Sequence, residues 1–228
     1  SKSGSLIESF DPDNLEPVGL DDGMALMALH SAHEVLILFK RDAMFALYGR
    51  TPQSWEIRLI SPAIGCVSHR SVVTVEGVTY WWSEQGPMAW AGSGVPVPLG
   101  QPAILAEVSA EVVNFSHLDK IGAAPDYEHQ RLLFAVPEVG ASRLTRILPY
   151  NYRLGAWEST GWRRMPDFAC LATIDDKSSV PRVFGGGYAG HVFQLWDTDA
   201  DGVPSGTTSG TFATGVGVTT ATTITDAT

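Results

Sequence analysis

An acidic stretch near the end of the sequence carries the clearest metal-binding pattern. In DTDADG (197–202), the aspartates Asp197, Asp199 and Asp201 alternate, and a glycine that permits a sharp turn follows them. Hard cations such as Ca²⁺ bind several oxygens of one short loop, and this spacing supplies them. An EF-hand also requires an acidic side chain where Thr208 stands, so an EF-hand is not supported. The stretch therefore predicts either a calcium loop on a hairpin or a solvated acidic turn, and no other cofactor is expected.

A second stretch, CVSHRS (66–71), groups a thiol, two hydroxyls, an imidazole and a guanidinium. A nucleophile and its base must converge in space, whereas neighbouring strand residues point to opposite faces. The sequence has no G-x-S-x-G turn, and no acidic residue nearby to orient His69. We interpret the stretch as a strand entry, with Cys66 buried as a small apolar side chain. No catalytic residues are predicted, and we expect the protein not to be an enzyme.

Three other groups of residues are better explained by structure than by chemistry. The six histidines are scattered and match no HExxH or comparable metal pattern. GGGYAG (185–190) lacks the Lys-Ser/Thr that follows a phosphate loop, so a hairpin turn is the better interpretation. Tryptophans can stack on sugars but more often pack between sheets. The seven tryptophans are Trp55, Trp81, Trp82, Trp90, Trp157, Trp162 and Trp196.

Composition excludes several classes of protein. The formal net charge is −10 over 228 residues, and an acidic surface disfavours tight binding to phosphate backbones. The two cysteines, Cys66 and Cys170, form no CxxC pair; two buried free thiols and synthesis in a reducing cytoplasm are expected. The longest apolar run, VLILF (35–39), falls well short of the roughly 20 residues that span a bilayer, so no membrane partner is expected.

The secondary structure predicted to position these residues consists of short strands separated by turns. Strands are predicted at 23–30 and 55–60, a hairpin at 34–49, and three strands within 71–92 with turns at Glu76-Gly77 and SEQG (83–86). An apolar pair before a turn recurs 43, 52 and 50 residues apart, as LF (38–39), WW (81–82), LF (133–134) and VF (183–184). Repeats of about 40–50 residues with several short strands are typical of β-propeller blades.

The sequence therefore predicts an all-β fold of propeller-like antiparallel hairpins, with four or five blades that belong to a larger ring. A closed small propeller and a pair of β-sandwiches stay open as alternatives. Residues 1–22 are predicted as an extended arm or entry loop, 23–200 as blades, and 201–228 as a Thr/Gly-rich β or flexible segment. Apolar spacing within 101–120 indicates a short helical insertion. The absence of an initiator Met and the ending in this stretch are consistent with a portion of a longer protein.

The stretch 23–200 resembles β-propeller proteins of tailed-bacteriophage virions. The similarity is carried by LILFKRDAMFALYG, then IGCVSHRSVVTVEGVTYWWSEQGPMAWAG, then LLFAVPEVG with YNYRLGAWES. These families include the tail nozzle or tubular tail protein and the packaged-DNA stabilisation protein of short-tailed phages. The resemblance covers about three quarters of the chain, and the order of the motifs is more specific than any one of them.

What the resemblance implies is a non-enzymatic ring component at the neck or tail that retains DNA and conducts it. The implied partners are other tail, neck and portal-proximal proteins and further copies in a homo-oligomeric ring, with DNA passing through without specific binding. The implied location is the virion, after assembly in the host cytoplasm. An acidic channel wall that repels phosphate would be compatible with this role.

Two other functions are open at the level of sequence. A carbohydrate-binding propeller at a tail tip would present an exposed tryptophan beside polar groups in a shallow pocket. A propeller hydrolase would bring two carboxylates to within about 5–10 Å at the mouth of the ring. No spacing in the sequence identifies such a pair, because residues that converge on a propeller come from different blades.

Overall fold

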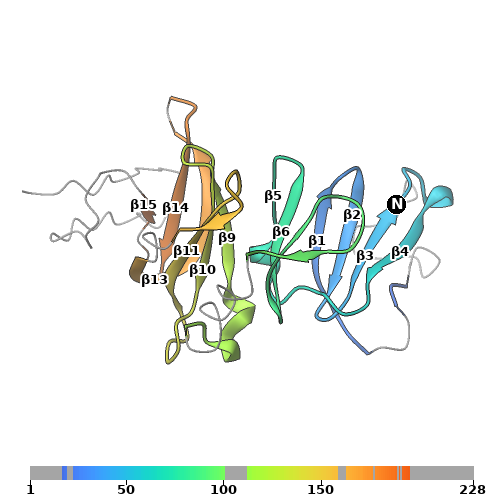
Figure 1. Cartoon of the computed structure of the whole chain (residues 1–228), viewed down its shortest axis with the longest axis horizontal. Coiled ribbons are helices and arrows are strands. Elements are labelled where there is room, and N and C mark those ends of the chain that lie inside the picture. The colour runs from blue at the N-terminus through green and yellow to red at the C-terminus, as the bar shows by residue number, and fades with distance from the viewer. Residues whose placement is uncertain are drawn as a thin grey trace, which may run out of the picture.

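The structure, a computed structural model, describes residues 17–19, 23–100, 112–158, 163–176, 178–188, 190 and 192–195. Antiparallel strands form three sheets, which follow one another along the long axis of the molecule (Figure 1). In this part of the chain the helices are short, and none has the length and apolarity needed to span a bilayer. They are the 3-10 helices η2 (Pro52–Ser54), η3 (His69–Ser71) and η4 (Phe115–Lys120).

The first sheet, sheet 1, is an up-and-down meander of four consecutive strands. The apolar run VLILF lies in β2 and pairs with the strand on either side. The turn between the first two strands is His33-Glu34, and both residues have positive φ, as the two-residue hairpin turn of type I′ requires. The strands are β1 (Leu26–Ala32), β2 (Val35–Lys40), β3 (Met44–Tyr48) and β4 (Glu56–Ser61).

The second sheet, sheet 2, repeats the same meander. Its first turn is Glu76-Gly77, where φ is 49° and 75°, so the glycine occupies a position that other residues adopt with strain. The predicted order of strand, turn, strand, turn, strand within 71–92 is thereby confirmed. The strands are β5 (Val73–Val75), β6 (Val78–Ser83), β7 (Gly86–Trp90) and β8 (Val97–Pro98).

The third sheet, sheet 3, has seven strands and curls on itself. Along the sheet the order is β15-β14-β13-β11-β10-β9, and β12 pairs with β11. The edge strand β9 contacts β13 and β14, which are not its neighbours in the sheet, and the Thr173 hydroxyl donates to the Pro125 carbonyl at 2.6 Å. The strands are β9 (Gly122–Asp126), β10 (Arg131–Val136), β11 (Leu144–Asn151), β12 (Ala156–Trp157), β13 (Arg163–Asp175), β14 (Pro181–Gly187) and β15 (Val192–Gln194).

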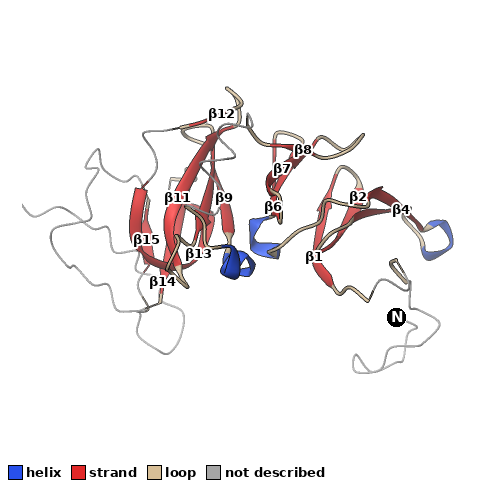
Figure 2. Cartoon of the chain, turned by 60° about the horizontal axis from the view of Figure 1, so that its bottom comes forward, coloured by secondary structure: helices blue, strands red, loops and turns tan. Residues whose placement is uncertain are grey.

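The sheets stack face to face, and their first strands lie next to one another. His30 of β1 hydrogen-bonds Thr74 of β5, and β5 in turn contacts β9. Figure 2 shows the same succession of sheets from a second direction. This is the arrangement of neighbouring propeller blades, in which the first strand of each blade lies nearest the axis. The protein is therefore an all-β, propeller-like assembly of antiparallel sheets, as the sequence predicted.

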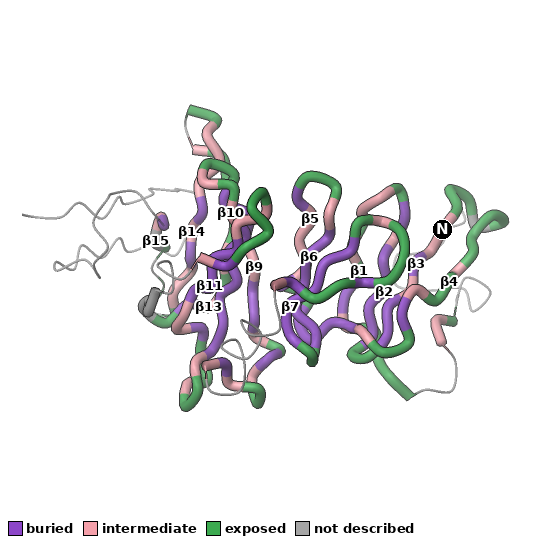
Figure 3. The backbone as a smooth tube through the Cα atoms, in the orientation of Figure 1, coloured by how far each residue is buried: buried purple, intermediate pink, exposed green. Residues whose placement is uncertain are grey.

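Three apolar cores hold the stack together. One lies between sheets 1 and 2 and includes Phe39 and Trp81; the next lies between sheets 2 and 3 and includes Trp82 and Phe134. Because consecutive strand residues point to opposite faces, Trp81 and Trp82 enter different cores. A third core, with Phe168, belongs to sheet 3 alone and is enclosed by its curl. The central strands of sheet 2 are thus buried on both faces, and Figure 3 shows β6 and β7 as largely buried segments.

The number of sheets differs from the four or five blades predicted. The third and fourth apolar pairs, at 133–134 and 183–184, lie in the same sheet, in β10 and β14. The reason is β13, a 13-residue strand that pairs with β11 on one side and β14 on the other. The fourth hairpin therefore extends the third sheet, and the four repeat units of the described residues occupy three sheets.

Two local predictions need correction or completion. The glycines at the start of GGGYAG lie in β14 and not in a hairpin turn. A Cβ added at Gly185 would meet the Phe168 ring at 2.4 Å, so glycine leaves room for that ring next to the register shift between β13 and β14. Of the predicted helical insertion at 101–120, residues 101–111 lie outside the described part, and η4 forms the end. The predicted segments 1–22, except 17–19, and 201–228 also lie outside it.

Candidate interaction surface

The predicted calcium loop cannot be placed in this fold. Asp197, Asp199 and Asp201 lie outside the described residues, so a calcium role for them stays a prediction. Within the described ranges, no group of three or more His, Cys, Asp or Glu side chains is arranged to hold a metal ion.

The CVSHRS stretch forms a buried turn before β5. The Ser71 hydroxyl donates to the Ser68 carbonyl at 2.7 Å and accepts from the Trp82 backbone N–H at 3.0 Å. Burial raises the pKa of the Cys66 thiol to about 11, which keeps it protonated and unreactive. His69 is exposed in η3. The structure thus brings no base to a nucleophile here, and it places a 3-10 turn where a direct strand entry was expected.

The second cysteine departs from expectation. Cys170 is exposed, whereas two buried thiols were predicted. It lies in β13 opposite Gly186, and a Cβ on that glycine would come within 2.9 Å of its sulfur. The apolar sequence around this cysteine indicates a strand but does not reveal which face the strand presents to solvent.

The tryptophans of the described residues pack mainly in the cores. Trp81, Trp82, Trp90 and Trp157 are buried, and the Trp81 Nε1–H donates to the Gly65 carbonyl at 2.8 Å. Trp55, which precedes β4, is 43% exposed. Trp162 and Trp196 lie outside the described part of the chain. Packing between sheets therefore accounts for four of the seven, in line with the structural interpretation.

A polar chain that sequence reasoning missed joins sheets 1 and 2. His30 Nε2 lies 2.8 Å from Thr74 Oγ1, Thr74 Oγ1 lies 2.8 Å from Thr79 Oγ1, and Thr79 Oγ1 lies 3.0 Å from His33 Nε2. Two hydroxyl hydrogens cannot supply three hydrogen bonds, so at least one histidine donates through Nε2. Each histidine lies more than 40 residues from its threonine partner in sequence, so no local pattern indicates their pairing.

The hydrogen bonds between these histidines and threonines predict that the stability of the protein depends on pH. Burial first, and repulsion by His33 second, lower the pKa of His30 below its usual value of 6.5. The unfolded chain then binds a proton more readily than the folded one, so stability is lost as the pH falls below about 6.5. We expect His30→Gln to show a smaller loss of stability between pH 8 and pH 5 than the wild type, in urea unfolding followed by circular dichroism.

The exposed His69 supplies the matched control for that measurement. His69→Gln should reproduce the pH dependence of the wild type, because this replacement leaves the contacts of His30 and His33 with the two threonines intact. An unchanged pH profile in His30→Gln would contradict the prediction.

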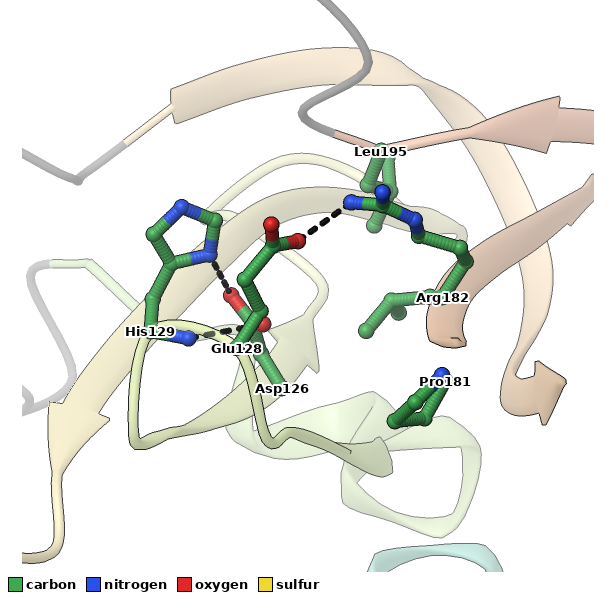
Figure 4. A pocket seen from close by; sticks show the side chains of 7 residues that line it. Asp126, Glu128, His129, Pro181, Arg182 and Leu195 are labelled. Atoms are coloured by element: carbon green, nitrogen blue, oxygen red, sulfur yellow. Dashed lines mark hydrogen bonds and ion pairs between the residues drawn. The ribbon is translucent and has the colours of Figure 1, made fainter. Parts of the chain in front are cut away.

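Charged residues also gather at the turn between β9 and β10 (Figure 4). Asp126 Oδ2 lies 2.9 Å from His129 Nδ1, and Glu128 pairs with Arg182. Arg182 also reaches Asp176 at 3.5 Å. Each of these carboxylates therefore has a hydrogen-bond or ion-pair partner within the protein. The arrangement connects the turn to β14.

An apolar surface on sheet 1 is the strongest candidate for an interaction. Ile37 and Ala46 point into the core shared with sheet 2, so the alternate residues of each strand point the other way. We call these alternate residues the outer face. Its apolar members are Leu29, Leu36, Leu38, Phe45, Leu47, Ile57 and Leu59, and the polar Ser31 lies among them.

The side chains of the outer face form two rows, in each of which residues on neighbouring strands are paired. Leu29 pairs with Leu38, Leu38 with Phe45, and Phe45 with Leu59, so one row crosses all four strands. Leu36, Leu47 and Ile57 form the second row across β2, β3 and β4, and Ser31 continues it in β1. The ends of the first row are exposed, Leu29 by 61% and Leu59 by 54%, whereas Leu38 in the middle of the row is buried, with 4% exposed.

One charged side chain adjoins the outer face. Lys40 lies at the end of β2, 5.9 Å from the centre of the Phe45 ring, and its Nζ donates to the Gly19 carbonyl at 2.9 Å. Residues 17–19 therefore reach this side of the sheet at Lys40. Among the described sheets, none packs on the outer face, because sheet 1 stands at the end of the stack (Figures 1 and 2).

Comparison with known proteins gives similarity at the level of fold. No protein-family model matches the chain, and no curated protein matches it. Solved structures that are similar include the Pan2 WD40 domain of Neurospora crassa, with 11% identity and a TM-score of 0.48 over 75% of this chain and 46% of that one. Saccharomyces cerevisiae Sqt1 has 10% identity and a TM-score of 0.38 over 74% and 58%.

A third similar structure is PorZ, an essential surface component of the type-IX secretion system of Porphyromonas gingivalis. It has 7% identity and a TM-score of 0.40 over 75% of this chain and 26% of that one. The chain spans less than two thirds of the length of each of these three proteins.

Proposed function

We propose that this chain is a non-enzymatic structural component of a tailed-phage virion, in a ring at the neck or tail that helps to retain and conduct DNA. The observation that carries the proposal is a stack of propeller-like sheets, in which sheet 1, at one end, has an apolar outer face. The resemblance of 23–200 to phage propeller proteins supplies the virion context. The partners proposed are other neck, tail and portal-proximal proteins and further copies in a homo-oligomeric ring, assembled in the host cytoplasm.

The absence of enzymatic activity is part of the proposal. It is supported by the pairing of polar groups in the described residues. The hydroxyl of Ser71 is committed to a buried turn, and the carboxylates Asp126 and Glu128 are paired with His129 and Arg182. These contacts give the three groups structural roles in the turns that they connect.

The DNA-conducting role is proposed on ring geometry and not on charge. The strands nearest the axis, β1, β5 and β9, carry one carboxylate among them, Asp126, and His129 is its partner. These three strands thus provide no acidic face, and the proposal does not depend on a channel wall that repels phosphate. A mostly uncharged lining gives DNA few groups to bind, which is compatible with passage.

Mass spectrometry of purified particles tests the proposal. The tryptic peptide LLFAVPEVGASR (132–143) should co-sediment with DNA-filled particles in a density gradient. Its abundance should correspond to a few to a few dozen copies per particle, with the major shell protein as the internal reference for copy number. Absence from particles, with the protein free in the lysate, would reject the virion role.

The carbohydrate-binding alternative has a narrower basis. Trp55 is exposed beside the polar turn of η2, where the Ser54 and Thr51 side chains hydrogen-bond each other. A glycan array would test it: signal that is lost in Trp55→Ala would favour sugar binding at a tail tip.

A further inference from the structure

Two histidines of sheet 1 and two threonines of sheet 2 are the members of the polar chain. His30 lies near the end of β1 and His33 in the turn that follows, whereas Thr74 and Thr79 are paired across β5 and β6. The three hydrogen bonds run in order from His30 to Thr74, to Thr79 and to His33. Neither hydroxyl has a further hydrogen-bond acceptor among the described residues, so the four side chains depend on one another.

The number of hydrogens limits how many protons the polar chain accepts. Each of the three links needs one hydrogen, and the two hydroxyls supply two of them, so the third comes from the Nε2–H of one histidine. The other histidine then accepts at Nε2, which requires that its ring is neutral. One protonated ring is therefore accommodated, because it donates while the neutral ring accepts.

A second proton releases one hydroxyl hydrogen from the polar chain. Both Nε2 atoms then donate, and the link between the threonines uses only one of the two hydroxyl hydrogens. The released hydrogen cannot belong to Thr79 without cost, because Thr79 is fully buried and a buried donor without an acceptor is destabilising. It must belong to Thr74, which is partly exposed, and must reach water. Double protonation therefore requires water at the contact between His30 and Thr74.

The charge of the second proton is not offset nearby. Burial first, and repulsion by His33 second, lower the pKa of His30. Glu76 is held by Arg153 at 2.6 Å, and in the described part of the chain no carboxylate forms an ion pair with either histidine. Lys40 of β2 points to the opposite face of sheet 1. The other charged or titratable side chains next to the histidines, or on the elements that pack against them, are Glu34, His69 and Arg70, all exposed.

The two ends of the polar chain differ in how firmly they are held. The His33 ring packs edge-on against Trp90, with the ring centres 5.1 Å apart. It also occupies the space beside Gly92, where an added Cβ would meet His33 Nδ1 at 2.7 Å. His30 has no comparable ring contact within the described residues, and its threonine partner is partly exposed. Opening is therefore expected at His30 and not at His33.

We propose that His30 and His33 form an acid-sensitive contact between sheets 1 and 2, which holds with at most one of the two rings protonated. When both rings are protonated, the contact opens between His30 of β1 and Thr74 of β5, while His33 stays on Trp90. The apolar core between the two sheets remains closed, so acidification loosens only the edge where their first strands meet. The inference does not depend on the virion role, which sedimentation with particles tests separately.

Nuclear Overhauser cross-peaks in the isotope-labelled chain of 228 residues test the proposal. The cross-peak between the His30 ring and the Thr74 methyl group should be present at pH 8 and lost at pH 5, and it should return when the pH is raised again. The cross-peak between the His33 ring and Trp90 should be present at both pH values. Retention of the His30–Thr74 cross-peak at pH 5, or loss of both cross-peaks, would overturn the proposal.

Replacement of His33 tests whether two positive rings are required. In His33→Gln only one ring of the polar chain can be protonated, so the His30–Thr74 cross-peak should persist at pH 5. The pKa of His30 should also rise, because the repulsion by His33 is removed. His33→Asn is the second variant, since asparagine readily adopts the positive φ of 54° at this position. His69→Gln is the control and should lose the cross-peak as the wild type does. Loss of the cross-peak at pH 5 in both His33 variants would also overturn the proposal.

Discussion

Trp82→Ala is expected to lower the free energy of unfolding by about 3–5 kcal/mol, the range for removal of a large buried aromatic side chain. Trp82 is fully buried between sheets 2 and 3, and its ring centre lies 5.5 Å from that of Phe134 in an edge-to-face arrangement. Loss of the indole leaves a cavity where the two sheets meet. Chemical unfolding followed by circular dichroism measures the change without relying on tryptophan fluorescence.

Two control variants separate packing from other effects. The Trp82 Nε1–H is buried and has no hydrogen-bond partner among the described residues, so Trp82→Phe removes an unsatisfied donor and keeps a ring. It should cost less than about 1.5 kcal/mol. Trp55→Ala, at a half-exposed position, should change stability by less than about 1 kcal/mol. If Trp82→Ala were as mild as Trp55→Ala, the core between the two sheets would be wrongly assigned.

Gly65→Ala is expected to destabilise the protein by about 3 kcal/mol, at the upper end of the cost of overpacking. A Cβ at this position would lie 2.3 Å from the Lys40 carbonyl oxygen and 2.4 Å from the Arg41 carbonyl carbon. These are backbone atoms and cannot rotate away. The same carbonyl of Lys40 accepts the Cys66 N–H at 2.9 Å, so the displacement would break the contact that joins this loop to sheet 1.

Gly122→Ala is the matched control. The Cβ there would meet its nearest neighbour, the Arg70 carbonyl oxygen, at 4.0 Å. Alanine should be neutral or raise stability by up to about 1 kcal/mol, because it restricts the unfolded chain. Thermal unfolding of both variants distinguishes a close backbone approach at Gly65 from a general intolerance of glycine replacement. Equal midpoints for the two variants would rule out the proposed clash.

Local patterns in the sequence determined the hairpins of this protein. Runs of strand-favouring residues between polar or Gly-containing turns located β2, β3, β6 and β7, because strand alternation and turn geometry depend on residues next to one another. Glu76-Gly77 is the clearest example, since the turn type needs just those two residues. The same patterns indicated that CVSHRS and most of the tryptophans have structural roles.

Only the tertiary structure decided how the hairpins combine and what their surfaces contact. The assignment of Trp81 and Trp82 to different cores, and of the fourth hairpin to the third sheet, depends on which sheets lie on either side. The His30–Thr74 contact joins residues 44 positions apart, and the room that Gly185 leaves for Phe168 likewise depends on pairing between strands. Such choices are set by long-range packing, which outweighs local preference, and for that reason the apolar outer face of sheet 1 is recognised only in three dimensions.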